Sequence, residues 1–223
     1  MDASGTRGKR GALIVVEGLD RAGKSSQCEF LHSFLEKSGH TVKYIRFPDR
    51  TTSIGKMINS YLQGQSHLDD HSIHLLFSAN RWELAQSIES DIADGTTVII
   101  DRYSYSGAVY SAAKNNPSLS LEWAWLPEIG LPKPDLCFFL SISPEAAAKR
   151  GGFGAERYEN ETMQARVREL FTTVFELQKK SNIQVIDAGK SFEEVSQDMS
   201  KIVTEAIARV DTASPLGKLT SIS

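Results

Sequence analysis

Five short runs of hydrophobic residues recur along the chain, and longer segments separate them. The runs are rich in β-branched and aromatic residues and occupy residues 12–17, 42–47, 97–101, 136–142 and 184–187. Glycine, proline or polar residues bound most of them, as is typical of strands buried inside a protein. The pattern therefore predicts five strands.

The segments between the runs have the hydrophobic period of amphipathic helices. Hydrophobic positions at Cys28, Leu31 and Leu35 predict a helix that starts at Lys24. Further helices are predicted over about residues 70–93, from Pro144 onward, and over 192–210. Strands that alternate with helices indicate an α/β fold, a parallel sheet with helices on both faces. Ligands in such folds bind beyond the carboxyl ends of the strands.

A chain of 223 residues suits one domain. We expect a flexible N-terminal lead at residues 1–11, a single domain over 12–210, and a polar, loosely ordered C-terminal tail at 211–223. Residues 115–134, which contain four prolines, show no regular pattern.

Composition excludes several classes of protein. Lys and Arg total 25 against 28 for Asp and Glu, a net charge of −3, so the basic excess typical of nucleic-acid binders is missing. No run approaches the roughly 20 apolar residues of a membrane helix, and the two cysteines have no histidine at metal-ligand spacing. We interpret His67, His71 and His74 as a solvated loop and helix start. These features predict a soluble cytoplasmic protein without a nucleic-acid or membrane partner, and the nucleus is a second candidate location.

Residues 18–25, GLDRAGKS, match the phosphate-binding loop pattern G-x-x-x-x-G-K-[ST]. They lie between the first predicted strand and the first predicted helix, which is the context the pattern requires. Backbone N–H groups and the helix N-terminus would bind phosphate oxygens, Lys24 would reach the β- and γ-phosphates, and the Ser25 hydroxyl can bind Mg²⁺. The alternative is a glycine-rich turn that binds nothing.

Charged and aromatic residues follow other predicted strands. Asp101 and Arg102 end the third strand, where the acid can hold a metal or its waters and the guanidinium can bind phosphate. Arg50 follows the second strand. Phe77 and Arg81 are one helical turn apart and could offer a stacking ring and a donor to a base. Alternatively, they are a core phenylalanine and a solvated arginine.

Three glycines among residues 151–154 predict a hinged flap within a lid of about residues 149–160. Lys149, Arg150 and Arg157 flank it and could add positive charge over transferring phosphates. An ordinary solvated loop is the alternative.

Several motifs in order resemble the thymidylate kinase family of P-loop nucleoside monophosphate kinases. Residues 99–111, IIDRYSYSGAVYS, look like its signature. Four further motifs resemble the eukaryotic and poxviral branch of this family: 47–50 (FPDR), 77–83 (FSANRWE), 130–135 (GLPKPD) and 156–160 (ERYEN). The resemblance implies a five-stranded parallel sheet with a small mobile lid, and a homodimer. It also implies transfer of the ATP γ-phosphoryl group to dTMP, giving dTDP and ADP for dTTP and DNA synthesis, with Mg²⁺ as cofactor.

The resemblance also implies roles for single residues. Lys24, Arg21, Asp101 and Arg102 would be catalytic, and Ser25 and Asp101 would serve the metal. The implied ATP-binding residues are Gly18, Ala22, Gly23, Lys24, Ser25, Ser26, Arg150 and Lys190. The implied dTMP-binding residues are Asp20, Phe47, Arg50, Phe77, Arg81, Arg102, Gly107, Tyr110, Tyr158 and Gln164.

Within the dTMP set the resemblance gives each group a task. Asp20 would accept from the sugar 3′-hydroxyl, Arg50 and Arg102 would hold the phosphate, and Tyr110 would close off the 2′ position. Phe77 would stack on thymine beside a hydrogen bond from Arg81.

Phosphoryl transfer needs alignment and charge neutralisation more than covalent chemistry, so we expect direct in-line transfer without a phosphoenzyme. A deoxynucleoside kinase is a rival, but Arg50 and Arg102 argue against it because a nucleoside carries no phosphate. A nucleotide-operated switch or adaptor is a second rival. It is disfavoured because Lys24, Asp101 and Arg102 are all present and no Asn-Lys-x-Asp guanine motif occurs.

Overall fold

Five parallel strands form the central sheet of this computed structural model, which describes residues 9–150, 157–158, 160–178, 182–210 and 214–222. The strands are β1 (Leu13–Gly18), β2 (Val42–Arg46), β3 (Thr97–Asp101), β4 (Leu136–Ser141) and β5 (Ile183–Asp187). Their order across the sheet is β2-β3-β1-β4-β5, and each pair of neighbours is parallel. All five predicted strands and the α/β class are therefore confirmed.

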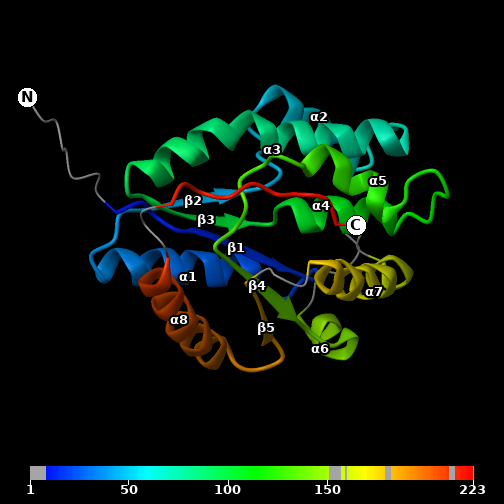
Figure 1. The fold of residues 1–223 in the computed structure, drawn as a ribbon. Coiled ribbons are helices and arrows are strands. Elements are labelled where there is room, and N and C mark those ends of the chain that lie inside the picture. Colours follow the sequence, from blue (N-terminus) through cyan, green and yellow to red (C-terminus); the bar gives the residue numbers. More distant parts are fainter. Residues whose placement is uncertain (1–8, 151–156, 159, 179–181, 211–213, 223) are drawn as a thin grey trace, which may run out of the picture.

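Helices cover both faces of this sheet (Figure 1). Helices α1 and α8 pack together on one face, and α3, α4 and α7 lie on the other. The helices and the 3-10 turn η1 are α1 (Lys24–Lys37), α2 (Ser53–Leu62), α3 (Asp70–Ala93), α4 (Ser104–Ala112), α5 (Leu121–Trp125), η1 (Leu126–Glu128), α6 (Pro144–Lys149), α7 (Glu161–Leu177) and α8 (Phe192–Arg209).

The core lies along the middle strands of the sheet. Every residue of β1 and β3 is buried, because both strands have a neighbour on each side and helices above and below. The edge strands β2 and β5 are only partly buried. The middle strands are thus held firmly, and the residues that follow their carboxyl ends start from fixed positions.

Residues 115–134 were expected to lack regular structure, and this expectation is wrong in part. The segment contains the short helix α5 and the 3-10 turn η1. Trp125 is buried, and its indole Nε1 donates to the Thr220 carbonyl at 2.7 Å. Tertiary contacts of the tryptophan hold a helix that is too short to show a periodic pattern in the sequence.

The C-terminal tail is also more ordered than predicted over residues 214–222. Leu219 and Ile222 are buried, and the tail pairs with the chain after η1 through Gly130 N to Leu219 O (2.9 Å) and Leu219 N to Leu131 O (2.8 Å). Figure 1 shows this red segment running between α3 and the sheet. Residues 214–222 therefore belong to the packed domain.

Two further expectations need correction. His74 is fully buried on α3 rather than solvated, and its Nδ1 lies 2.7 Å from Ser111 Oγ. The described end of the lead is fixed, because Arg10 forms two hydrogen bonds of 2.8 Å to Asp135. The rest of the lead, residues 1–8, and the predicted flap at 151–154 lie outside the described residues. Within the described ranges no helix is long and apolar enough to cross a membrane.

Candidate active site

A cavity of about 500 Å³ lies beyond the carboxyl ends of β1, β2 and β3. The fold predicts a ligand site at this edge of the sheet. The predicted site residues that line it are Asp20, Arg21, Gly23, Lys24, Ser25, Ser26, Phe47, Arg50, Phe77, Arg81, Asp101, Arg102, Gly107, Tyr110 and Tyr158. The structure thus brings the phosphate-loop residues and most of the predicted dTMP residues into one cavity.

The phosphate loop joins β1 to α1 in the predicted way. Gly18 has a φ of 149°, and a Cβ there would lie 2.5 Å from the Leu140 carbonyl oxygen, so glycine is required. Ala22, within the loop, is buried. The buried Lys24 ammonium donates to the carbonyls of Gly18 (3.1 Å) and Leu19 (2.6 Å). Burial and the nearby Arg102 charge lower the pKa of Lys24 to about 8.

Arg21 and Arg102, two of the arginines predicted to act on phosphates, share a backbone feature. Each has a φ of 64°, in the left-handed region that non-glycine residues rarely adopt. Such a conformation costs about 1 to 3 kcal/mol and persists where the surrounding structure enforces it, often at functional sites. Both arginines line the cavity, so their unusual backbone conformation is consistent with a functional site there.

Asp101 and Ser25 meet between β3 and α1. The Ser25 hydroxyl donates to Asp101 Oδ2 at 2.6 Å, and the Tyr44 hydroxyl donates to the same oxygen at 3.2 Å. Asp101 is 1% exposed, and its Oδ1 has no hydrogen-bond partner among the described residues. Arg46, which sequence reasoning missed, lies 3.8 Å from Oδ2 and also lines the cavity.

Arg102 and Asp20 form an ion pair in the wall of the cavity. Gln164 of α7 donates to the second Asp20 oxygen at 2.7 Å and to the Tyr158 carbonyl at 3.2 Å, so it acts through these residues rather than lining the cavity itself. Burial alone would raise the pKa of Asp20, but Arg102 and Lys24 outweigh it and lower that pKa below its ordinary value.

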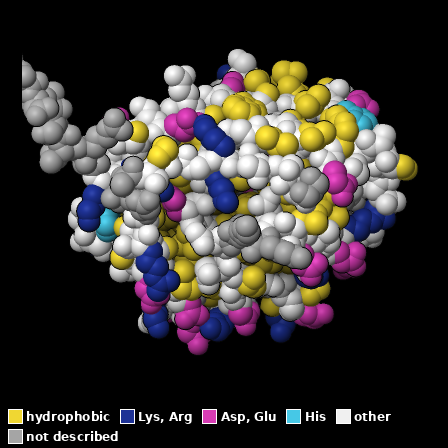
Figure 2. All heavy atoms as spheres, in the orientation of Figure 1, with side chains coloured by type: hydrophobic (Ala, Val, Ile, Leu, Met, Phe, Trp, Pro, Cys, Tyr) yellow, Lys and Arg dark blue, Asp and Glu magenta, His cyan; other side chains and the backbone are white. Residues whose placement is uncertain are grey.

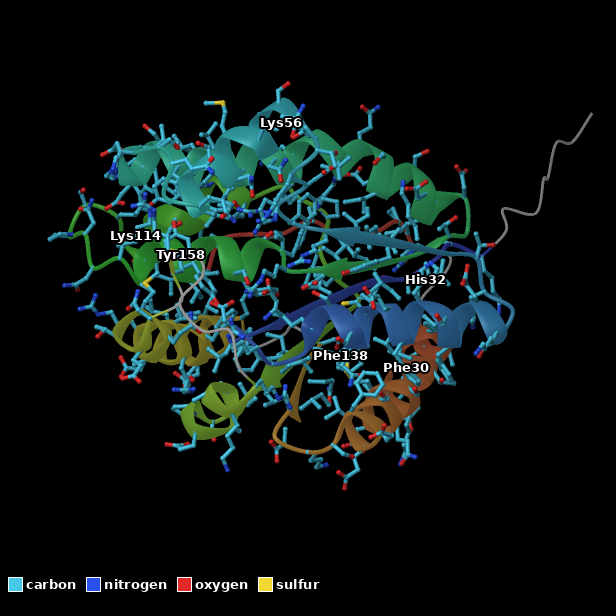
Figure 3. All side chains as sticks on the ribbon, turned by 180° about the vertical axis from the view of Figure 1, so that it is seen from behind. Phe30, His32, Lys56, Lys114, Phe138 and Tyr158 are labelled. Atoms are coloured by element: carbon cyan, nitrogen blue, oxygen red, sulfur yellow. The ribbon has the colours of Figure 1, made fainter. Side chains whose placement is uncertain are left out.

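The aromatic side of the cavity combines three segments. Tyr110 and Tyr158 lie with ring centroids 5.8 Å apart, and the Arg102 guanidinium lies 5.4 Å from the Tyr110 ring centroid. Figure 3 shows Tyr158 beside Lys114, whose ammonium is 5.7 Å from the Tyr158 ring centroid. Phe77 is half-buried on α3 and lines the same cavity.

Arg50 is held at the turn that follows β2. Its Nη1 donates to Asn59 Oδ1 of α2 at 2.9 Å. The buried Asn80 amide bonds both backbone groups of Asp49, accepting from its N–H at 2.7 Å and donating to its carbonyl at 3.2 Å. Asn80 therefore fixes the turn from which Arg50 enters the cavity.

The alternative reading of Phe77 and Arg81 is wrong for the arginine. Arg81 is 3% exposed, and Glu128 of η1 accepts from its Nε (2.7 Å) and its Nη2 (2.5 Å). The guanidinium is therefore a buried, paired group rather than a solvated one. It still lines the cavity, one helical turn from Phe77.

Of the residues predicted near adenine or in the lid, Tyr158 lines the cavity, whereas Arg150, Arg157 and Lys190 do not. Arg150 lies beside the phosphate loop, where its Nη1 donates to the Arg21 carbonyl at 2.9 Å. Lys190 is exposed and pairs with Asp198 at 2.8 Å. Arg157 contacts the C-terminal end of α2 instead. It donates to the Tyr61 carbonyl at 3.0 Å, and its guanidinium lies 4.2 Å from the Tyr61 ring centroid.

Sequence reasoning missed two buried acids that support the site. Glu17 accepts from the N–H groups of Tyr103 and Ser106, both at 2.9 Å, and thereby holds the start of α4 next to Arg102. Burial raises its pKa, although these hydrogen bonds oppose the shift. Glu17 had a sequence signal, an acid within a buried strand, whereas Glu128 in the irregular segment had none.

Comparisons with known proteins agree with this geometry. A family model described as thymidylate kinase matches residues 16–199. A thymidylate kinase of Arabidopsis thaliana is 49% identical over 95% of this chain and 78% of its own length. One of Homo sapiens is 47% identical over 95% of this chain and 98% of its own length.

A solved structure supports the same relationship. The thymidylate kinase from Candida albicans superposes with a TM-score of 0.86 at 39% identity, over 96% of this chain and 100% of that one. Agreement in sequence and in fold extends through the phosphate loop, the cavity and α7. The chain therefore belongs to the thymidylate kinase family.

Proposed function

We propose that this protein transfers the γ-phosphoryl group of ATP to dTMP, giving dTDP and ADP for dTTP and DNA synthesis. The observation that carries the proposal is the shared cavity. The phosphate loop lines it from one side, and Arg50, Arg102 and Phe77 line it from the others. A donor phosphate and an acceptor phosphate can thus meet within one site, which is what direct transfer requires.

On the donor side, the loop N–H groups and Lys24 bind the phosphates of ATP. Lys24 now donates to the loop carbonyls of Gly18 and Leu19, so it exchanges these bonds for phosphate oxygens when ATP binds. Arg21 adds positive charge at the transferring group. Arg150 and Lys190 are proposed to lie near adenine. The hydrogen bond from Arg150 to the phosphate loop supports a role of Arg150 in ATP binding.

On the acceptor side, Arg50 and Arg102 hold the dTMP phosphate, and Asp20 accepts from the sugar 3′-hydroxyl. Tyr110 restricts the space at the 2′ position, and Phe77 stacks on the base. The remaining proposed contacts come from Phe47, Arg81, Gly107, Tyr158 and Gln164. This side carries the discrimination between dTMP and a nucleoside, because only dTMP brings a phosphate for Arg50 and Arg102 to bind.

The donor atoms near the loop fit Mg²⁺. Asp101 Oδ1 is a buried carboxylate oxygen without a partner among the described residues, and the Ser25 hydroxyl is close by. Mg²⁺ takes oxygen ligands and commonly uses one or two protein groups together with substrate phosphates and water. The described residues contain no group of three or more acid, His or Cys side chains that could hold a metal on their own. Ser25 and Asp101 would hold the ion, which when bound neutralises charge on the β- and γ-phosphates.

The protein's part in the reaction is alignment and charge stabilisation. Arg102 and Arg50 orient the acceptor oxygen, while Lys24 and Arg21 stabilise charge on the transferring group. Transfer is direct and in line, without a phosphoenzyme. Trapping a phosphorylated form of the protein would contradict this step.

A homodimer is proposed from the surface. Exposed hydrophobic side chains come from α2, α3 and the η1 region, namely Met57, Leu75, Trp82, Leu126 and Ile129. Figure 2 shows hydrophobic side chains gathered over this part of the molecule. A patch of this kind favours association. Leu75→Glu is expected to convert dimer to monomer in sedimentation velocity, and an unchanged mass would contradict the proposed interface.

We also propose action in the cytoplasm, because both cysteines are free and buried, as suits a reducing compartment.

The deciding experiment measures ADP release with Mg²⁺-ATP and one acceptor at a time: dTMP, dUMP, thymidine, dCMP or AMP. Strong release with dTMP, weaker with dUMP and none with thymidine supports the proposal. Preference for thymidine would indicate a nucleoside kinase. Tight ATP binding without turnover of any acceptor would indicate a switch.

A further inference from the structure

Arg81 and Glu128 form a fully buried pair beside the cavity. Glu128 is 0% exposed and takes two parallel hydrogen bonds, from Nε and from Nη2 of the guanidinium. The third nitrogen, Nη1, has no hydrogen-bond partner among the residues that the structure describes, and Arg81 lines the cavity. The carboxylate therefore occupies one edge of the guanidinium and leaves Nη1 available to a ligand.

The turn that carries Glu128 is fastened to α3. Ser78 and Trp82 of α3 both donate to the Pro127 carbonyl, at 3.1 and 2.8 Å. These residues flank Arg81 on the same helix. The turn thus contacts α3 through the backbone next to Glu128 as well as through the ion pair.

The C-terminal segment fastens the same turn from its other side. Trp125 donates to the Thr220 carbonyl before η1, and Gly130 donates to the Leu219 carbonyl after it. Lys218 adds an ion pair to Glu89 of α3. Glu128 is therefore carried by a turn with little freedom to move away from α3.

Gly107 of α4 limits the guanidinium from a further direction. A Cβ at Gly107 would lie 2.3 Å from Arg81 Nη2 and 2.9 Å from Nη1, so the group packs against bare backbone. Contact with α4 and the bonds to Glu128 together define the plane and the position of the guanidinium. Such fixed geometry is required for a donor that reads one atom of a ligand.

We propose that Glu128 is the positioning residue for base recognition: it presents Arg81 Nη1 to the cavity as a fixed hydrogen-bond donor. This inference rests on the proposed function. A fixed donor favours a pyrimidine with a carbonyl at position 4, as in thymine and uracil, over one with an amino group there, as in cytosine. An amino group opposite Nη1 would leave this donor unpaired under the bound base.

The test is the kinetics of Glu128→Gln with dTMP, dUMP and dCMP. Glutamine has nearly the same shape but places an N–H₂ group opposite one of the two guanidinium donors, so the guanidinium must shift. We expect the KM for dTMP to rise by about 10-fold or more, and the ratio of kcat/KM for dTMP over dCMP to fall by about 10-fold. The KM for ATP should change less than about 2-fold, because Glu128 supports the acceptor side.

The matched control is Glu89→Gln, the same substitution at an α3 carboxylate that pairs with the C-terminal segment but not with Arg81. It should keep the parental KM values and the parental base preference. If Glu128→Gln raises both KM values together, or keeps the preference for dTMP over dCMP, then Glu128 has a structural role alone and the inference is wrong.

A second measurement covers the case in which Glu128→Gln does not fold, since breaking a buried ion pair is strongly destabilising. Glu128→Asp keeps the charge of the carboxylate but shortens its side chain. We expect this substitution to lower the ratio of kcat/KM for dTMP over dCMP in the parent protein. In a protein that already carries Arg81→Lys, the same substitution should change this ratio little. If Glu128→Asp lowers this ratio equally in the parent and in the Arg81→Lys protein, the inference is wrong. Absence of dTMP phosphorylation by the parent would instead overturn the proposed function, so the two failures are distinguishable.

Discussion

Arg102 and Asp20 are separated by 82 residues in the sequence, yet they form an ion pair in the wall of the cavity. Arg102 follows β3, and Asp20 lies in the phosphate loop after β1, so the pairing of these two neighbouring strands brings them together. Both are proposed to bind dTMP, one at the phosphate and one at the sugar. The pair therefore holds the arginine in place before substrate arrives, and the lowered pKa of Asp20 keeps the carboxylate charged.

Arg102→Lys should reduce kcat/KM for dTMP by at least ~10²-fold, the scale for loss of one donor to the transition state. Lysine keeps the positive charge but cannot provide the planar fork that serves Asp20 and a phosphate together. Steady-state kinetics with dTMP measure the loss. Near-normal turnover by the Arg102→Lys variant would show that Arg102 does not act in the reaction.

Asp101→Asn should raise the concentration of Mg²⁺ needed for half-maximal activity by about 10-fold or more. The change removes the charge of the carboxylate whose Oδ1 has no partner in the described part of the chain, while nearly keeping its shape. A Mg²⁺ titration at saturating ATP and dTMP measures it. Tyr44→Phe is the control, since it removes a hydrogen bond to Oδ2 but keeps the carboxylate, and it should retain the parental Mg²⁺ dependence. An unchanged titration for Asp101→Asn would contradict a metal role.

Stability should fall as the pH decreases from about 6.5 to about 4 because of His74. Burial and the Arg81 charge lower the pKa of His74 to about 4 from its ordinary value of 6.5. Between these values the unfolded chain binds the proton and the folded chain does not, so acid favours unfolding. Over this pH range, His74 should lower the free energy of unfolding by about 3 kcal/mol.

Urea denaturation of His74→Gln at pH 7 and pH 4.5 tests this assignment. The variant should lose less stability between the two pH values than the parent does, because glutamine does not titrate. His67→Gln, at an exposed position before α3, is the control and should follow the parent. Equal losses in parent and His74→Gln would rule out His74 as the source.

Leu219→Ala should lower the free energy of unfolding by about 2 to 5 kcal/mol, the range for a buried leucine. Leu219 is 2% exposed and pairs through its backbone with the chain after η1. Lys218→Ala, which removes a half-exposed ion pair, should cost less than about 1 kcal/mol. A loss at Leu219 no greater than at Lys218 would show that the tail does not pack in solution as it does here.

The local pattern of the sequence determined the parts of this protein that depend on near neighbours. The strand runs, the phosphate loop at 18–25 and the acid and arginine at 101–102 are each contiguous, so spacing and residue type are enough to identify them. The parallel sheet then follows from their alternation with helices, and the sheet places Asp101 and Arg102 near the phosphate loop.

Tertiary structure decided the rest because the contacts involved join distant segments. Glu128 lies 47 residues from Arg81 in the sequence. It belongs to a 3-10 turn of three residues, which is too short to produce a periodic hydrophobic pattern. Leu219 lies in a polar tail and is buried because two other segments meet it, and His74 is buried by α4 and α5 rather than by its own helix. Long-range burial and ion pairing are properties of the assembled fold, and a local sequence pattern does not record them.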